Sequence, residues 1–133
     1  MSVESTKEAM MRYKAADHSD TSMMADDVVF TVMATGQRHE TPEGVLGMLN
    51  YFYHVAFEAT AEPLTEIYGD SNAVLEAVFV GKHLGEFAGI PATGKSVRVP
   101  FCVVYDLESA KIKQGRVYFE IPALMAQLGI EMG

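Results

Sequence analysis

Residues 81–100 read Gly-Lys-His-Leu-Gly-Glu-Phe-Ala-Gly-Ile-Pro-Ala-Thr-Gly-Lys-Ser-Val-Arg-Val-Pro. Glycine recurs through this segment and a proline lies near its middle, a composition typical of tight turns. β-Branched and apolar residues precede and follow the glycine-rich part, as is usual for strands. We therefore expect a long strand over residues 73–87, a turn, and another strand over residues 96–107.

The rest of the chain extends this pattern in both directions. Towards the C-terminus, Glu108-Ser-Ala110 predicts a hairpin turn before a strand over residues 111–119, and a short helix over residues 122–128 ends at Gly129. Towards the N-terminus, apolar spacing and composition predict helices over residues 4–16, 23–27 and 41–57, and strands over residues 28–33 and 64–68. Helices followed by antiparallel strands indicate an α+β fold.

Length and composition narrow the class of protein. A chain of 133 residues with 49 % apolar residues fits one domain spanning residues 1–133. It has no apolar run near the ~20 residues of a membrane helix and no secretory signal, so we expect no membrane partner. A net charge of −8 without a basic cluster argues against nucleic-acid binding. The single cysteine, Cys102, suits a reducing cytoplasm.

Three segments resemble the SnoaL-like polyketide cyclases: residues 81–100, Lys111-Ile112, and Glu120-Ile-Pro-Ala-Leu-Met-Ala-Gln-Leu-Gly129. Those proteins belong to the nuclear-transport-factor-2-like (NTF2-like) superfamily. The resemblance implies a cone, in which N-terminal helices pack on a strongly curved antiparallel sheet that encloses one pocket. It also implies a small apolar ligand in that pocket, catalysis without a cofactor, and a homodimer.

The expected hairpin predicts which side chains face the pocket, because strand side chains alternate between two faces. Phe79 and His83 fall on the inner face of the long strand. If Leu107 pairs with Ile112, the inner face also holds Val99, Phe101, Val103, Tyr105, Gln114, Arg116, Tyr118 and Glu120. Polar groups there must pair, meet water or meet a ligand, because burial without a partner costs about 2–7 kcal/mol. The opposite face is mixed, and its apolar part is a candidate dimer surface.

Three of these polar residues are candidates for catalysis. In an apolar pocket Glu120 would have a raised pKa and could act as a general acid or base. The resemblance implies an aspartate at this position, one methylene shorter; alternatively, Glu120 is a carboxylate at a helix N-terminus. Arg116 could polarise a carbonyl oxygen or simply pair with Glu120. His83 could shuttle protons or be hydrogen-bonded within the sheet.

A further set of residues is predicted to contact the ligand. Tyrosine hydroxyls could donate hydrogen bonds to a ligand oxygen, although buried tyrosines are more often core residues. The predicted ligand contacts are Tyr13, Tyr53, Phe79, Phe101, Tyr105, Gln114 and Tyr118. No metal site is predicted, since the spacings typical of metal ligands are absent from the sequence.

Two functions remain open at this stage. The first is general acid–base catalysis on an apolar carbonyl compound, such as aldol ring closure or a related isomerisation; the second is non-catalytic binding of a small hydrophobic molecule. Tyr13 also matches the oxyanion tyrosine of ketosteroid isomerases, but no carboxylate occurs at the matching positions near Val32 and Cys102, which disfavours that chemistry. The direction of the Glu120 carboxyl group separates the two functions.

Overall fold

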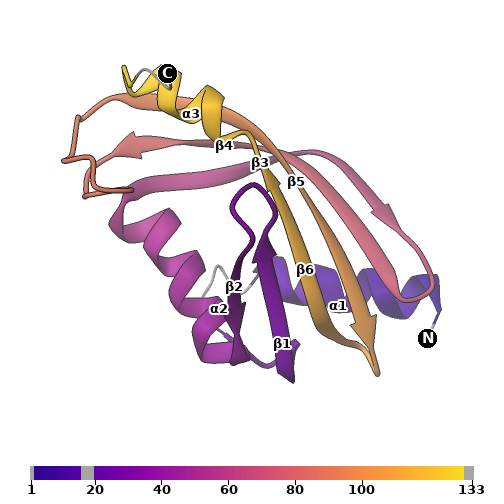
Figure 1. Cartoon of the computed structure of the whole chain (residues 1–133). Coiled ribbons are helices and arrows are strands. Elements are labelled where there is room, and N and C mark those ends of the chain that lie inside the picture. Colours follow the sequence, from indigo (N-terminus) through magenta and orange to yellow (C-terminus); the bar gives the residue numbers. More distant parts are fainter. Residues whose placement is uncertain (1, 16–19, 131–133) are drawn as a thin grey trace.

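The computed structural model describes residues 2–15 and 20–130 (Figure 1). Its elements are α1 (Val3–Ala15), β1 (Met24–Val32), β2 (Gln37–Glu40), α2 (Thr41–Asn50), the π-helical turn η1 (Tyr51–Val55), β3 (Phe57–Tyr68), β4 (Asn72–His83), β5 (Ser96–Glu108), β6 (Lys111–Phe119) and α3 (Ile121–Gln127). The α+β class predicted from the sequence is confirmed. Ala16, the last residue of the first predicted helix, lies outside the described residues.

The strands form a curved, open sheet in the order β2-β1-β6-β5-β4-β3. Neighbouring strands are antiparallel except β1 and β6, which run parallel. The long strands bend together in Figure 1, and α2 packs on β1 while α1 packs on β3 and β4. The short helix α3 packs on β5. Among the described residues, no helix is both long and apolar enough to cross a bilayer.

Two regions differ most from the sequence prediction; in addition, the long strand expected to reach Phe87 ends at His83, and the helix expected to reach Phe57 ends at Val55. Residues 23–27 were expected to be helical, but Met24–Val32 forms strand β1, whose buried residues Met24, Val28, Phe30 and Val32 face the core. Pairing with β2 and β6 overrides the weak local preference here. β3 begins at Phe57, seven residues before the predicted start at Leu64. The prediction missed this first half because it lies on an exposed edge of the sheet, where many residues are polar.

Close backbone packing explains two glycines of the 81–100 segment. A Cβ atom on Gly81 would lie 2.5 Å from the Cβ of Ala59, and one on Gly85 would lie 2.4 Å from the carbonyl oxygen of Val55. The N–H groups of Leu84 and Gly85 both donate to the carbonyl oxygen of Ala56, each at 3.0 Å. The glycines therefore let the end of β4 lie directly on η1 and the start of β3.

A β-bulge in the β5–β6 hairpin changes which side chains face inward. Leu107 pairs with Ile112 as predicted, but Asp106 pairs with Gln114, so Lys113 is an extra residue on β6. The predicted faces are therefore wrong from Gln114 onward. Gly115, Val117 and Phe119 face the core, and Gln114, Arg116 and Tyr118 face outward. Without the bulge, the guanidinium of Arg116 would be buried, which is costly.

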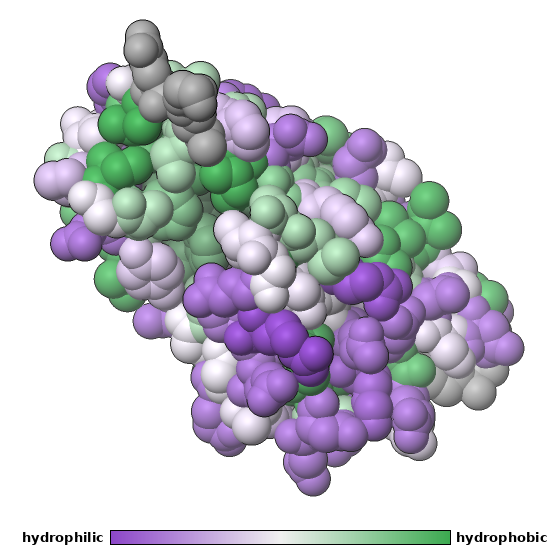
Figure 2. Space-filling model, in the orientation of Figure 1, coloured by the Kyte–Doolittle hydropathy of each residue, from purple (hydrophilic) through white to green (hydrophobic). Residues whose placement is uncertain are grey.

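The surface is polar in one part and apolar in another. Figure 2 shows hydrophilic side chains gathered over the lower part of the view, where β1, β2 and the β5–β6 hairpin lie in Figure 1. Hydrophobic side chains gather at the upper left, around η1 and the segment after β4. Exposed apolar residues of these segments include Tyr51, Val55 and Leu84.

Candidate functional site

A cavity of about 290 Å³ lies between the inner face of the sheet and the helical segments α1, α2 and η1. Five of the seven predicted ligand contacts line it: Tyr13, Tyr53, Phe79, Phe101 and Tyr105. Gln114 and Tyr118 do not, because the bulge turns both towards solvent. The structure thus places the predicted aromatic residues of α1, η1, β4 and β5 at the cavity and the two predicted residues of β6 away from it.

Three tyrosines bring hydroxyl groups to this cavity. Tyr13, Tyr53 and Tyr105 are each less than a tenth exposed, and the rings of Tyr13 and Tyr105 meet edge to face with centroids 5.9 Å apart. Burial raises the pKa of all three, and the nearby Tyr53 adds to the effect on Tyr13 and Tyr105. A hydrogen bond between the two side chains lowers the pKa of Tyr13 and raises that of Tyr105. At neutral pH all three hydroxyls therefore stay protonated.

Phenylalanine rings form another part of the wall. The ring of Phe119 contacts those of Phe79, Phe101 and Phe52, with centroid distances of 5.5, 5.9 and 6.3 Å. Phe30 lies against Tyr105 at 6.0 Å. These contacts join β1, β4, β5, β6 and η1 around one apolar space, which excludes water from most of the wall.

Lys14 is the one charged residue among the described residues that line the cavity. Its ammonium group is paired with the carboxylate of Glu66 and donates to the hydroxyl of Tyr68 at 3.3 Å. Burial lowers the pKa of Lys14, whereas the Glu66 carboxylate favours the charged form. Neither a carboxylate nor a histidine lines the cavity among these residues. Across the same described part of the chain, no group of three His, Cys, Asp or Glu side chains is placed to hold a metal ion.

Comparison with known proteins identifies the family of this chain. Residues 9–128 match the sequence pattern of the SnoaL-like polyketide cyclases.

The chain belongs to the SnoaL-like polyketide cyclase family.

Solved structures show how widely the fold of this SnoaL-like chain is shared. A proposed SnoaL-like polyketide cyclase from Jannaschia sp. CCS1 has a TM-score of 0.81 at 18% identity, over 97% of this chain and 94% of that one. A proposed polyketide cyclase from Xanthomonas campestris pv. campestris has a TM-score of 0.81 at 16% identity, over 94% of this chain and 97% of that one. A Catenulispora acidiphila protein with a ketosteroid isomerase-like fold, solved with trimethylamine, has a TM-score of 0.74 at 16% identity, over 93% and 94%.

These identities establish the fold alone, which is the NTF2-like fold predicted from the sequence. No curated protein matches the chain. The activity of this SnoaL-like chain therefore has to be inferred from its own residues.

Glu120 does not occupy the inner-face position predicted for it. It is the exposed residue that precedes α3, and its side chain makes no capping hydrogen bond. It does not line the cavity, although its neighbours Phe119 and Ile121 both do. The structure therefore supports the alternative position, a carboxylate at the start of a helix.

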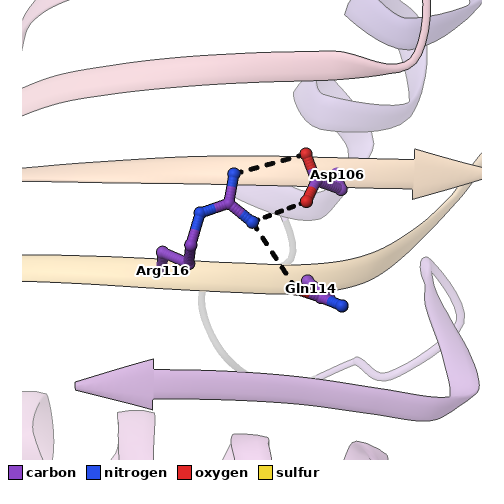
Figure 3. Close-up of polar contacts among 3 residues, drawn as sticks. All are labelled: Asp106, Gln114 and Arg116. Carbon is purple, nitrogen blue, oxygen red and sulfur yellow. Dashed lines mark hydrogen bonds and ion pairs between the residues drawn. The ribbon is translucent and has the colours of Figure 1, made fainter. Parts of the chain in front are cut away.

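Arg116 lies on the outer face rather than the predicted inner face, and it pairs with Asp106 rather than Glu120 (Figure 3). Its Nη1 and Nη2 atoms lie 2.6 and 3.4 Å from the two carboxylate oxygens of Asp106. Nη1 also donates weakly to Gln114 at 3.5 Å. The hydrogen bond with Asp106 raises the pKa of Arg116. The contact joins β5 to β6 across the outside of the sheet.

His83 is fully buried on the inner face, as predicted, but it does not line the cavity. Its Nδ1 accepts a hydrogen bond from the backbone N–H of Thr93 at 3.2 Å and lies 3.0 Å from Thr93 Oγ1. The ring stacks on Phe57 at 5.1 Å. His83 therefore holds the segment before β5 against the sheet through this hydrogen bond. This position is closer to the alternative of a hydrogen-bonded histidine than to a proton shuttle.

Sequence reasoning missed Val117 and Phe119, two cavity residues on β6. The missed signal is the apolar series Gly115, Val117 and Phe119, which alternates with the polar series chosen instead. Gly115 belongs inside because a Cβ atom there would lie 2.8 Å from the ring of Phe30. The apolar series indicates that the two faces of β6 are exchanged, but not at which residue the exchange begins.

Proposed function

We propose that this SnoaL-like chain binds one small, mostly apolar molecule in the cavity and holds an oxygen atom of that molecule against the tyrosine hydroxyls. One observation carries the proposal: the buried, protonated tyrosines Tyr13, Tyr53 and Tyr105 line one cavity whose other described lining residues, apart from Lys14 and Thr60, are apolar. Small-molecule sites typically combine apolar walls with a few polar groups that fix the ligand's orientation. A carbonyl or hydroxyl oxygen is the acceptor that neutral tyrosines would recognise.

Binding can be tested with 2-naphthol, whose own fluorescence reports on its surroundings. Ala77 is fully buried and lines the cavity, so Ala77→Leu should fill the space and weaken binding at least tenfold. Ala126→Leu, the same change on the exposed face of α3, should leave the affinity unchanged. Equal affinities in the two variants would place the probe outside the cavity and contradict the proposal.

A second candidate is cofactor-independent acid–base catalysis of the aldol or isomerisation type on a bound carbonyl compound. The tyrosine hydroxyls would stabilise negative charge on the carbonyl oxygen, and a base would remove a neighbouring proton. One observation favours Glu120 as that base: it is exposed and stands in the chain between the cavity residues Phe119 and Ile121. Glu120 would then act from outside the cavity wall rather than from inside the cavity.

The Glu120→Gln variant tests this second candidate. The amide keeps the size of the side chain but cannot take up a proton, so turnover of a bound carbonyl compound should be lost while 2-naphthol affinity stays within about twofold. Turnover that persists in the variant would remove Glu120 from the mechanism. Binding without turnover in the unmodified protein would leave the non-catalytic function.

The expected protein partner is a second copy of the chain. We propose that the contact lies on the outer face of β4 and β5, where Val78, Cys102 and Val104 are half-buried. Val104→Glu should turn a dimer into a monomer in light scattering, and a monomeric unmodified protein would contradict the assignment.

Burial raises the pKa of the Cys102 thiol, and the negative charge of the nearby Glu76 raises it further. A protonated, unreactive thiol suits the cytoplasm, where we expect this protein to act.

A further inference from the structure

The volume of the cavity limits the size of the ligand. At about 290 Å³, it lies just below the range of roughly 300–1,000 Å³ found for small-molecule pockets. Buried strand residues packed on their neighbours, such as Ala77, Phe79 and Val103, form part of the wall, and the edge strand β3 adds the exposed Thr60 and Pro63. Close-packed interiors yield little volume without strain. A compact ligand is therefore favoured over an extended one.

The spacing of the lining residues along β5 agrees with this limit. Across the hairpin, Tyr105 lies opposite Gly115, and Phe101 lies opposite Phe119. Tyr105 and Phe101 are four residues apart on β5, a separation of about 13 Å at the rise of ~3.3 Å per residue. The tyrosine and phenylalanine side chains occupy part of this length. The remaining space fits one or two fused rings better than four.

Phe119 closes the end of the cavity opposite Tyr13 and Tyr105. It is the last residue of β6, and its ring contacts one ring from each of η1, β4 and β5. Removing it would open the wall towards α3, because the next cavity residue along the chain is Ile121, at the start of that helix. Phe119 is therefore the residue whose size most directly sets the length of the cavity.

The charge of the wall restricts the ligand further. The ammonium of Lys14 already has the Glu66 carboxylate as its partner, so a ligand carboxylate would compete with Glu66 for it. A ligand cation would find neither a carboxylate nor a histidine among the described residues of the wall. Burying an unpaired charge in such surroundings is strongly unfavourable. A neutral ligand fits best.

We propose that the cavity selects a neutral compound of one or two fused rings with a single hydroxyl or carbonyl oxygen, and that Phe119 sets its upper size. This inference rests on the proposed binding function. The ligand oxygen lies at the Tyr13 and Tyr105 end, and the far edge of the ring lies against Phe119. The double variant Tyr13→Phe, Tyr105→Phe should bind 2-naphthol about five- to tenfold more weakly. Its affinity for naphthalene, which has no oxygen, should be unchanged.

A series of probes with one hydroxyl each tests the size limit at pH 7. Phenol, 2-naphthol, 9-phenanthrol and 1-hydroxypyrene have one, two, three and four fused rings. In an open groove, affinity would rise along the series with apolar area. Here it should be highest at 2-naphthol, and 1-hydroxypyrene should bind at least tenfold more weakly. A steady rise to 1-hydroxypyrene would overturn the size limit.

Variants at two adjacent aromatic positions test the role of Phe119. Phe119→Ala should strengthen 1-hydroxypyrene binding at least tenfold and should move the best ligand to a larger ring system. Tyr118→Ala removes an exposed ring on the other face of β6 and should leave the ranking unchanged. Phe119→Leu, a milder change, should shift the ranking in the same direction. An unchanged ranking in both Phe119 variants would contradict the assignment.

Charge selectivity is tested with 2-naphthoate, which has the ring system of 2-naphthol and a carboxylate. It should bind the unmodified protein at least 100-fold more weakly, and Glu66→Gln, which frees Lys14, should reduce that gap at least tenfold. If none of the neutral probes binds, the proposed function itself fails. If 1-hydroxypyrene or 2-naphthoate binds as tightly as 2-naphthol, the function stands and the selectivity proposed here fails.

Discussion

Buried polar side chains lie beside a cavity at one end of β4 and are packed away from it at the other end. Near Ala73, which pairs with Tyr105, the tyrosine hydroxyls lie beside a cavity. At the other end, His83 is packed against Phe57 and held by Thr93, and it lines no cavity. The glycine-rich segment of residues 81–100 builds this second, closed end. That segment therefore shapes the scaffold, whereas the chemistry of the cavity depends on residues spread over other elements.

The largest expected effect is alkaline destabilisation at the tyrosine end. Burial raises the pKa of Tyr13, Tyr53 and Tyr105 above their unfolded value of 10. Their contribution to stability is therefore complete below pH 10 and is lost as pH rises through 10 towards the folded pKa. The unfolding free energy should fall by about 1.4 kcal/mol per tyrosine between pH 9 and 11, or about 4 kcal/mol in all.

Urea denaturation across this pH range measures that loss. Tyr105→Phe removes one of the three groups and should reduce the loss by about a third. Exposed Tyr118, changed to Phe, should leave it unaltered. A pH profile that Tyr105→Phe does not change would mean that the tyrosine end is open to solvent.

Backbone crowding should dominate at the closed end. A Cβ on Gly85 would meet the carbonyl oxygen of Val55 at 2.4 Å, so Gly85→Ala should lower the unfolding free energy by about 3 kcal/mol. Gly47→Ala, on α2, meets nothing within 4 Å and should stabilise by up to about 1 kcal/mol. Both values can be read from urea denaturation midpoints. A tolerated Gly85→Ala would show that β4 and η1 are less tightly packed than described.

A smaller loss is expected for His83. His83→Leu leaves the backbone N–H of Thr93 without its acceptor and should cost about 2 kcal/mol. His83→Asn supplies an amide oxygen and should recover part of that stability. Neither change should alter 2-naphthol affinity, measured on the folded protein by fluorescence titration. Lost affinity in the more stable Asn variant would instead assign His83 a part in the ligand site.

The smallest effect concerns the β5–β6 turn, next to the tyrosine end. Ser109 and Ala110 have φ angles of 52° and 64°, in the left-handed region that favours glycine. Ala110→Gly should therefore raise the unfolding free energy by about 1 kcal/mol. Ala126→Gly, in the exposed part of α3, should lower it by a similar amount. Thermal melts of both variants measure these changes in stability. A destabilised Ala110→Gly protein would contradict the strained turn.

The fold could be predicted where the apolar pattern and the turn chemistry agree. The β4 and β5 strands, the Ser109–Ala110 turn and the inward positions of Phe79, Phe101 and Tyr105 all follow from alternation and glycine placement. The first half of β3 could not be predicted in this way. It is an edge strand whose exposed Glu58, Thr60 and Glu62 carry little apolar signal.

The candidate site was predicted less well, and on β6 one physical reason accounts for this. The pairing of Leu107 with Ile112 was right, but a single extra residue exchanged the two faces of β6 beyond it. The structure therefore has Val117 and Phe119 in the cavity wall, where the prediction had Gln114, Arg116 and Tyr118. The local sequence does not specify where a strand takes up an extra residue. The cost of burying Arg116 decides it, and that cost depends on the whole sheet.

The bulge at Lys113 has a consequence for how this hairpin can change in evolution. Lys113 is the residue taken up outside the regular pairing, so its deletion should leave Ile112 inward, Gln114 outward and the cavity unaltered. Deleting Gly115 instead, two positions later and past the bulge, would exchange the inward and outward faces of the end of β6. The hairpin thus tolerates a length difference at one place only, and sequence alignments of relatives should place their gaps there.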